Sequence, residues 1–334
     1  MRAMVLAAGL GTRLRPITYG MPKPMVPVVN RPVMEHILRL LARHGFTETI
    51  ANLHWFPETI TAHFGDGSGC GVSLSYSPEE QLLGTSGGVR KAAEFLGGSF
   101  LVISGDALTD IDLKAMREFH ESHDGVATLA TKRVEDTSQF GVAITGADGR
   151  IQGFQEKPDP AEALSDLANC GIYMFRSEIF DFFPAPGTSK AAGEGDPEGF
   201  ADWAMDVFPA LLESDVPFYS HEVDAYWNDI GSLEELREGN LDALHGKVRL
   251  ELEGELADGV RTGTPEEDEG ALRGPVLLGE GCELGDDVRI DGPAIVGDRA
   301  KIGAGSRLRE VIVLPGAEIG PRTTLVGAIA AKRA

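Results

Sequence analysis

The N-terminal part of the chain alternates between short apolar runs and amphipathic segments. Apolar residues at helical spacing across 33–44, ended by Gly45, predict a helix there. Further helices are predicted at Pro57–Phe64, Gly88–Leu96 and Leu113–His123, and strands at Met4–Ala8, Thr49–Leu53, Val72–Tyr76, Phe100–Ile103 and Val126–Thr131. This alternation predicts an α/β fold with a Rossmann-like, mostly parallel mixed sheet covered by helices. Ligands of such folds bind at the carboxyl ends of the strands.

The C-terminal part of the chain follows a different period. Apolar residues recur every six positions, at Leu278, Leu284, Ile290, Val296, Ile302, Leu308 and Leu314. Small or apolar residues stand two positions before them, at Val276, Cys282, Val288, Ala294, Ala300, Ser306 and Ile312. A period of six matches neither a helix nor a simple strand. It is typical of the hexapeptide repeats of a left-handed parallel β-helix.

Two stretches rich in glycine and acidic residues interrupt the pattern. Residues 184–199 and 263–270 are predicted to form flexible surface loops. The change of period then predicts three parts: an N-terminal α/β domain over 1–240, a linker and entry to the tail over 241–274, and a β-helix over 275–334.

The charge balance limits the classes of partner. A formal net charge of −22 argues against nucleic acid, whose phosphates require a basic surface. An anionic small molecule needs local positive charge from a few Lys or Arg side chains, backbone N–H groups and a metal ion. No apolar run approaches the ~20 residues of a membrane span, so no membrane partner is expected.

The placement of cysteines and histidines bears on the compartment and on the type of chemistry. The three cysteines are far apart and form no CxxC pair, which favours reduced thiols and a cytoplasmic protein. The eight histidines show no HxxxH or HExxH spacing, so a zinc enzyme or a nucleophilic triad is not supported.

A glycine loop follows the first predicted strand. It reads Gly9-Leu10-Gly11-Thr12-Arg13, and Lys23 stands between two prolines ten residues further on. The loop is neither a dinucleotide fingerprint nor a P-loop, because the third glycine of the one and the GK[ST] ending of the other are missing. Its backbone N–H groups, the Arg13 guanidinium and the Lys23 ammonium can instead hold phosphate oxygens.

These motifs resemble those of the sugar-1-phosphate nucleotidyltransferases, whose N-terminal signature reads GxGTRLxPxT…PKPMxP. The resemblance covers about residues 1–240, and hexapeptide tails are also common in that family. The matching motifs after the signature are Leu83–Gly88, Gly105-Asp106, Gly141-Val142, Glu156-Lys157-Pro158, Asn169–Tyr173 and Trp227–Gly231.

The resemblance implies a nucleotidyltransferase fold and a Mg²⁺-dependent reaction of a nucleoside triphosphate with a hexose 1-phosphate, which releases pyrophosphate. It implies catalytic roles for Arg13, Lys23, Asp106, Lys157 and Asp229. It places the metal on Asp106 and Asp229, and the sugar phosphate on Gly141, Glu156, Lys157 and Asn169. It places the nucleotide on Leu6, Ala8, Gly9, Gly11, Thr12, Arg13, Gly84 and Thr85.

Local chemistry bears on two of these motifs independently. Asp106 follows a buried apolar run, so its carboxylate is expected at the carboxyl end of a strand, and two separated aspartates can supply the ligands that Mg²⁺ prefers. Neighbouring side chains of an extended segment point to opposite sides. Glu156 and Lys157 can therefore serve one ligand only if the backbone bends between them.

Several alternatives remain open. PKPMVPV and the tail favour a mannose-1-phosphate guanylyltransferase, whereas Arg15–Tyr19 and Phe154–Pro158 resemble UDP-glucose and dTDP-glucose pyrophosphorylases equally well. A catalytically silent regulatory subunit is a hypothesis of another class, and the presence of the whole charged set argues against it. An acetyltransferase tail is disfavoured because no histidine follows His245. The tail is therefore expected to join copies of the chain into a homo-oligomer.

Overall fold

The computed structural model describes residues 1–250, 260–261 and 272–332. The predicted loop at 263–270 lies outside these residues. The chain divides into two compact units. We call the first, formed by Met1–Leu10, Pro22–Pro24 and Ile37–Asp229, the sheet unit, and the second, formed by Gly11–Met21, Met25–His36 and Ile230–Ala334, the coil unit.

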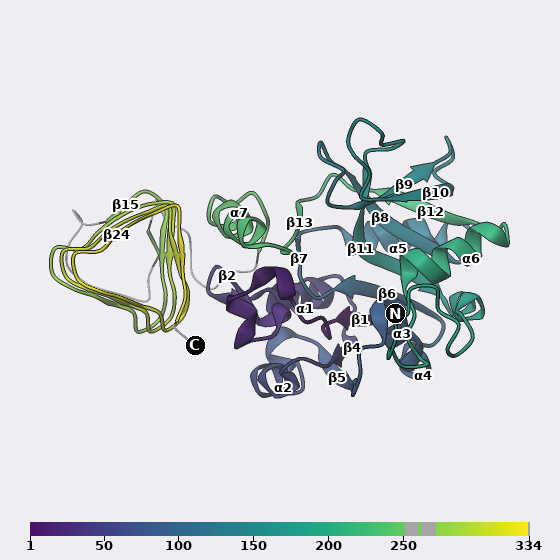
Figure 1. Cartoon of the computed structure of the whole chain (residues 1–334), viewed down its shortest axis with the longest axis horizontal. Helices are drawn as coiled ribbons and strands as arrows, with labels where there is room; N and C mark the ends of the chain where they lie inside the picture. Colours follow the sequence, from purple (N-terminus) through teal and green to yellow (C-terminus); the bar gives the residue numbers. More distant parts are fainter. Residues whose placement is uncertain (251–259, 262–271, 333–334) are drawn as a thin grey trace. The chain divides into compact units, whose positions relative to one another are not determined.

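The sheet unit is built on a nine-stranded sheet with strand order β10-β9-β11-β6-β1-β4-β5 (Figure 1). The other two strands are β8, which pairs with β11, and β12, which pairs with β8. Its strands are β1 (Arg2–Leu6), β4 (Glu48–Leu53), β5 (Ser73–Pro78), β6 (Ser99–Ser104), β8 (Ala127–Arg133), β9 (Gly141–Thr145), β10 (Ile151–Glu156), β11 (Leu167–Arg176) and β12 (Phe218–Glu222). A separate pair joins β7 (Ala107–Thr109) to β13 (Trp227–Asp229). The helices are α2 (Pro57–Phe64), α3 (Gly84–Lys91), α4 (Ala93–Leu96), α5 (Leu113–Glu121) and α6 (Phe208–Glu213), and α1 (Val33–Arg43) is shared by the two units.

The α/β prediction is confirmed as a mixed sheet. The parallel part is formed by β6, β1, β4 and β5, the strands predicted from the first apolar runs. The antiparallel part enters through β11, which pairs with β6, β8 and β9. Helix α2 has the predicted bounds, and the helix predicted at Gly88–Leu96 begins four residues earlier and is divided at Ala92 into α3 and α4.

One aromatic cluster fills the core on the antiparallel side. Phe100, Phe175 and Phe208 are fully buried there, and Trp203 stacks on Phe175 with ring centroids 4.6 Å apart. Burial of such large rings is a main source of stability for a sheet of this size.

The predicted surface loop at 184–199 contains no helix or strand, yet it is attached at several points. Arg90 of α3 donates to the carbonyls of Pro184 and Gly199, at 2.8 and 3.0 Å. The buried Asp206 carboxylate accepts from Ser189 Oγ at 2.6 Å and from the Lys190 N–H at 2.7 Å. These bonds hold the loop against the elements on either side of it.

The coil unit contains a parallel β-helix, whose strands stack around three faces in Figure 1. Its sheets are β14-β16-β19-β22-β25, β15-β18-β21-β24 and β17-β20-β23. The strands are β14 (Val260–Arg261), β15 (Leu272–Arg273), β16 (Val276–Leu278), β17 (Glu283–Leu284), β18 (Arg289–Asp291), β19 (Ala294–Val296), β20 (Lys301–Ile302), β21 (Arg307–Arg309), β22 (Ile312–Val313), β23 (Glu318–Ile319), β24 (Thr324–Val326) and β25 (Ile329–Ala330).

The register confirms the hexapeptide period and corrects its last step. Ile290 pairs with Leu308, eighteen residues or three hexapeptides later. Val296 pairs with Val313 rather than Leu314, because the corner at Glu310 is one residue shorter than the corner at 292–293. The glycine corners let successive coils touch, since a Cβ at Gly297 would lie 2.4 Å from the Pro315 nitrogen.

The coil unit also holds a hairpin of β2 (Pro27–Val28) and β3 (Arg31–Pro32) and the helix α7 (Leu233–Leu244). Asn240 of α7 is 1% exposed; it accepts from the Val29 N–H at 2.8 Å and donates to the Pro27 carbonyl at 3.3 Å. At the hairpin tip, Asn30 donates to the Val296 carbonyl of the β-helix at 3.2 Å. Hydrogen bonds thus join hairpin, helix and β-helix within one unit.

Two imidazoles of the sheet unit, those of His120 and His123, are packed where α5 meets β8. The Gly125 N–H donates to His123 Nδ1 at 3.1 Å, so neutral His123 carries its proton on Nε2, which lies 2.9 Å from Thr128 Oγ1. The Thr128 hydroxyl then donates to His120 Nδ1 at 2.8 Å. The proton of His120 is left on Nε2, which is buried and has no partner among the described residues.

None of the helices in the described part of the chain has the length and apolar character needed to cross a membrane.

We expect the Asn240→Ala variant to lower the free energy of unfolding by about 2 kcal/mol, because the Val29 N–H would lose its partner in a buried place. Urea unfolding measures this difference. The exposed Gln139→Ala variant is the control and should change stability by less than about 0.5 kcal/mol. Equal stability of the two variants would show that the hydrogen bonds of Asn240 to the hairpin do not stabilise the fold.

We expect acid to destabilise the protein through His120. Burial, with smaller contributions from Arg176 and His123, lowers the pKa of His120 to about 4. The unfolded chain protonates near pH 6.5, so this residue's contribution, up to about 3 kcal/mol, is lost as the pH falls from 6.5 towards 4. Unfolding measured at several pH values should show a shallower loss for His120→Gln, whereas the exposed His63→Gln variant should follow the wild type.

Candidate active site

A cavity of about 330 Å³ opens at the carboxyl ends of the parallel strands of the sheet unit. Leu6 at the end of β1, Asn52 near the end of β4 and Ser104 at the end of β6 line it. Its other walls come from Ala7–Gly9, from the N-terminus of α3, and from Phe200 and Asp202. This is the edge at which the sequence predicted ligand binding, and the volume suits a small organic molecule.

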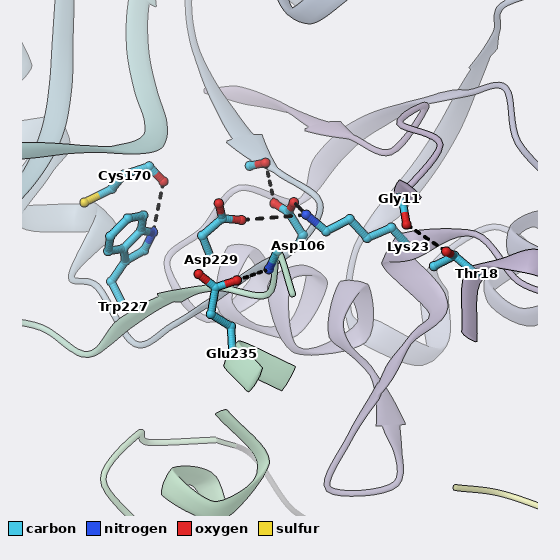
Figure 2. Close-up of polar contacts among 10 residues, drawn as sticks. Gly11, Thr18, Lys23, Asp106, Cys170, Trp227, Asp229 and Glu235 are labelled. Atoms are coloured by element: carbon cyan, nitrogen blue, oxygen red, sulfur yellow. Dashed lines mark hydrogen bonds and ion pairs between the residues drawn. The ribbon is translucent and has the colours of Figure 1, made fainter. Parts of the chain in front are cut away.

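Three charged residues from distant parts of the chain meet at this edge. Asp106 lies between β6 and β7, and Asp229 ends β13, where it pairs with Ala107 of β7. The Lys23 ammonium forms an ion pair with Asp106 Oδ2 and lies 3.8 Å from Asp229 Oδ1 (Figure 2). Lys23 and Asp106 also line the cavity. The predicted cation and both predicted metal-binding carboxylates are therefore brought together.

The turn that carries Asp106 depends on the preceding glycine. The Gly105 N–H donates to the Leu6 carbonyl at 2.9 Å, and a Cβ at position 105 would lie 2.4 Å from that oxygen. Ser104 Oγ donates to Asp106 Oδ1 at 2.5 Å. The turn and the hydroxyl together fix the direction of the carboxylate.

Two opposing effects set the pKa of Asp106. Burial raises the pKa of this carboxyl, whereas the Lys23 charge and the hydrogen bonds from Lys23 and Ser104 lower it. The lowering effects dominate, and the pKa is held below its ordinary value. Asp106 is therefore an anion at neutral pH.

The same two carboxylates suit a divalent cation. They already hold one cation, the Lys23 ammonium, and carboxylate oxygens are the ligands that Mg²⁺ prefers. Within the described residues no group of three or more His, Cys, Asp or Glu side chains is arranged to hold a metal ion. Asp106 and Asp229 would thus leave most coordination positions to water and to the phosphates of a ligand.

The bend expected between Glu156 and Lys157 is present. Lys157 has φ of +47°, in the left-handed region, and its N–H donates to the Phe140 carbonyl at 3.0 Å. The bend brings Lys157 Nζ to 3.6 Å from Glu156 Oε1. Both side chains are more than half exposed, so either can reach a ligand.

The other residues predicted for the sugar lie in the same unit. Gly141 of β9 pairs with Glu156 of β10, and a Cβ at Gly141 would approach Glu156 Oε2 to 3.0 Å. Asn169 lies at an irregularity of β11, where its side chain donates to Tyr173 Oη at 3.0 Å and accepts from the Gly171 N–H at 3.1 Å. None of these residues lines the described cavity.

The remaining loop residues divide between the units. Leu6, Ala8, Gly9, Gly84 and Thr85 line the cavity.

Gly11, Thr12 and Arg13 belong to the coil unit. There Gly11 has φ of +62° and accepts from Thr18 Oγ1 at 2.7 Å. The Arg13 guanidinium lies beside Gly231, where a Cβ would be 3.0 Å from it. Arg13 of the GxGTR motif and Gly231 of the Trp227–Gly231 motif thus lie side by side within the coil unit.

The glycines of α3 make close backbone contacts that the sequence did not indicate. A Cβ at Gly84 would lie 2.4 Å from the Ala201 carbonyl oxygen, and one at Gly87 would lie 2.4 Å from that of Gly199. Thr85 Oγ1 donates to Asp202 Oδ2 at 2.7 Å. The segment after the 184–199 loop therefore forms one wall of the cavity.

Four residues that the sequence did not predict also line the cavity: Asn52, Leu82, Phe200 and Asp202. Asn52 had a usable signal, because a polar residue near the end of an otherwise buried strand is typical of a ligand-binding edge. Phe200 and Asp202 had none, since they follow a long irregular loop whose path depends on Arg90 and Asp206.

A family model, several relatives and solved structures match this chain. The family model described as "Nucleotidyl transferase" matches residues 2–246. A UTP–glucose-1-phosphate uridylyltransferase of Synechocystis sp. is 36% identical, over 98% of this chain and 86% of the relative. A mannose-1-phosphate guanylyltransferase of Mycobacterium tuberculosis is 33% identical, over 91% and 81%. A Bacillus anthracis protein assigned as a glucose-1-phosphate thymidylyltransferase, solved with sucrose, superimposes with a TM-score of 0.62 and 25% identity, over 72% of this chain and 94% of that one.

Proposed function

Because the chain belongs to the nucleotidyl transferase family, we propose that it joins a nucleoside triphosphate to a hexose 1-phosphate and releases pyrophosphate. The observation that carries the proposal is the Lys23 ammonium beside the Asp106 and Asp229 carboxylates at the edge of the cavity. The reaction brings two polyanions together in a protein of net charge −22. It therefore needs this local arrangement of positive charge and cation-binding oxygens.

The reaction requires no protein nucleophile. The second pKa of a phosphate monoester is about 6, so the sugar phosphate is largely a dianion at neutral pH. One of its oxygens forms a bond to the α-phosphorus, and the bond from that phosphorus to the bridging oxygen breaks. The electron pair leaves with pyrophosphate.

The chain's own groups bind and orient the two substrates. We assign Lys23 to the α-phosphate and Lys157 to the sugar phosphate. The Gly9–Thr12 backbone and the Arg13 guanidinium are assigned to the β- and γ-phosphates. Each of these groups neutralises charge that would otherwise keep the substrates apart.

Sugar hydroxyls are assigned to the Glu156 carboxylate, the Asn169 amide and the Gly141 backbone. The base is assigned to the N-terminus of α3, with Gly84 and Thr85, and the end of β1 with Leu6 and the following Ala8 completes the nucleotide site. Asp106 and Asp229 would hold Mg²⁺, which when bound supplies positive charge to the triphosphate.

For the substrates, we place UTP with glucose 1-phosphate first and GTP with mannose 1-phosphate second. The Synechocystis relative aligns with 98% of the chain, tail included, and this supports the first pair. The Mycobacterium relative and the PKPMVPV segment support the second pair. Residues 1–240 would carry the reaction, 241–274 would link, and 275–334 would join copies of the chain.

We expect a pyrophosphate-release screen to show activity with one of these pairs well above all others. The screen combines five nucleoside triphosphates with the 1-phosphates of glucose, mannose, galactose and N-acetylglucosamine, in the presence of Mg²⁺. A silent regulatory subunit would release no pyrophosphate with any pair, and that outcome would overturn the proposed function.

We expect the Asp106→Asn variant to lose at least about 10²-fold in kcat, because one of two cation-binding carboxylates would be lost. Its fold should survive, which circular dichroism checks. Asp166→Asn is the control: this exposed carboxylate pairs with Arg133 and should be dispensable. Near-normal turnover of Asp106→Asn would reject the role assigned to this carboxylate.

A further inference from the structure

Two loops of the cavity are connected by a buried polar pair that the proposed chemistry does not use. The phosphate loop, Ala7–Gly9, follows β1, and the base loop, Leu82–Thr85, includes the first two residues of α3. Asn52 and Glu79 lie between them and are 3% and 5% exposed. Buried polar groups are costly unless every atom is paired, so a pair in this place calls for a physical reason.

Asn52 holds the phosphate loop. The pairing of β1 with β4 ends at Leu6 opposite Asn52, and the next N–H, that of Ala7, donates to Asn52 Oδ1 at 2.8 Å. The side chain thus continues the strand ladder by one bond. At its other end, Asn52 Nδ2 donates to Glu79 Oε1 at 2.8 Å.

Glu79 holds the base loop. Its second oxygen, Oε2, accepts from the Leu83 N–H at 3.1 Å, directly before the first residue of α3. Within the described residues, no Lys, Arg or His side chain forms an ion pair with this carboxylate. N–H donors and the positive end of α3 therefore compensate its charge.

The main chain around Glu79 is also fixed. Its N–H donates to the Leu53 carbonyl at 2.7 Å, and its carbonyl lies 2.9 Å from His54 Nδ1. Helix α3 passes directly over the pair, because a Cβ at Gly88 would lie 2.5 Å from Glu79 Oε1 and 2.7 Å from Asn52 Nδ2. The absence of a side chain at Gly88 is what allows this approach.

We infer that Asn52 and Glu79 are positioning residues, which hold the phosphate loop and the base loop at the separation that a nucleoside triphosphate spans. The inference rests on the proposed function. In this role Asn52 acts through its bonds to the Ala7 N–H and the Glu79 carboxylate. The continuous path runs from the Ala7 N–H through Asn52 and Glu79 to the Leu83 N–H.

Each hydrogen bond of this path has a fixed donor and acceptor, so exchanging the amide of Asn52 and the carboxylate of Glu79 tests the path. In Asn52→Asp, position 52 still accepts from Ala7, but its second oxygen faces the Glu79 carboxylate and repels it. In Glu79→Gln, only one oxygen remains. It can accept from the Leu83 N–H or from the Asn52 amide, and the new NH₂ group faces the other donor. In the double variant Asn52→Asp/Glu79→Gln, the carboxylate and the amide have changed places, and all three hydrogen bonds can form again.

The experiment measures KM and kcat of the purified full chain for both substrates of the active pair, and the Kd of the triphosphate alone by equilibrium dialysis. We expect each single variant to raise the Kd and KM of the triphosphate about tenfold, which corresponds to about 1.4 kcal/mol. The KM of the sugar phosphate should change less than about twofold. The double variant should return most of the triphosphate affinity.

Two further variants control for stability. Thr49→Val removes a buried hydroxyl from the same strand, which bonds the Phe46 carbonyl and does not line the cavity. It should lower the melting temperature without changing triphosphate affinity. If a single variant does not fold, the uncharged Asn52→Ser variant replaces it, with the same expected loss of affinity.

Unchanged triphosphate affinity in the single variants would overturn the inference. So would a double variant that binds the triphosphate no more tightly than the single variant of lower affinity. Absence of pyrophosphate release by the wild type would instead reject the proposed function. The triphosphate Kd values would still test the positioning role in that case.

Discussion

The cavity edge depends on one electrostatic arrangement, the Lys23 ammonium held beside the Asp106 and Asp229 carboxylates. Each carboxylate alone would add to the excess of negative charge in a chain of net charge −22. The ammonium compensates them and holds the pKa of Asp106 below its ordinary value in spite of burial. The result is a small region that can accept a cation and phosphate oxygens together.

This arrangement requires loops that cannot move freely, and buried polar contacts hold them. Gly105 allows the backbone after β6 to approach Leu6, which directs Asp106 to the cavity. Asn52 and Glu79 connect the loops after β1 and before α3 through three hydrogen bonds. The strands supply a rigid frame, and these few polar bonds set the geometry of the loops on it.

In the coil unit, too, a regular frame is combined with a few polar side-chain bonds. The β-helix stacks its coils through glycine corners, and its last turns shift by one residue without losing the buried apolar column. Within this unit Asn240 and Asn30 connect α7, the hairpin and the β-helix by side-chain to backbone bonds. The bond from the Val29 N–H to Asn240 gives a buried backbone donor of the hairpin its acceptor.

Local patterns in the sequence determined the elements and the chemistry. Apolar spacing predicted helix α1, helix α2 and the parallel strands to within a few residues, and the period of six predicted the β-helix. The GxGTR and PKP motifs identified Lys23, and the strand before Asp106 predicted its place at the sheet edge. These properties depend on neighbours a few positions away, so the sequence carries them directly.

Only the tertiary structure decided which of these residues meet. Asp229 reaches Asp106 because β13 pairs with β7, and the path of the segment before Phe200 follows from contacts with Arg90 and Asp206. The left-handed backbone at Lys157 and the one-residue slip after Leu308 are likewise invisible in a periodic pattern. Strand register and loop paths are set by long-range packing, which no local pattern contains.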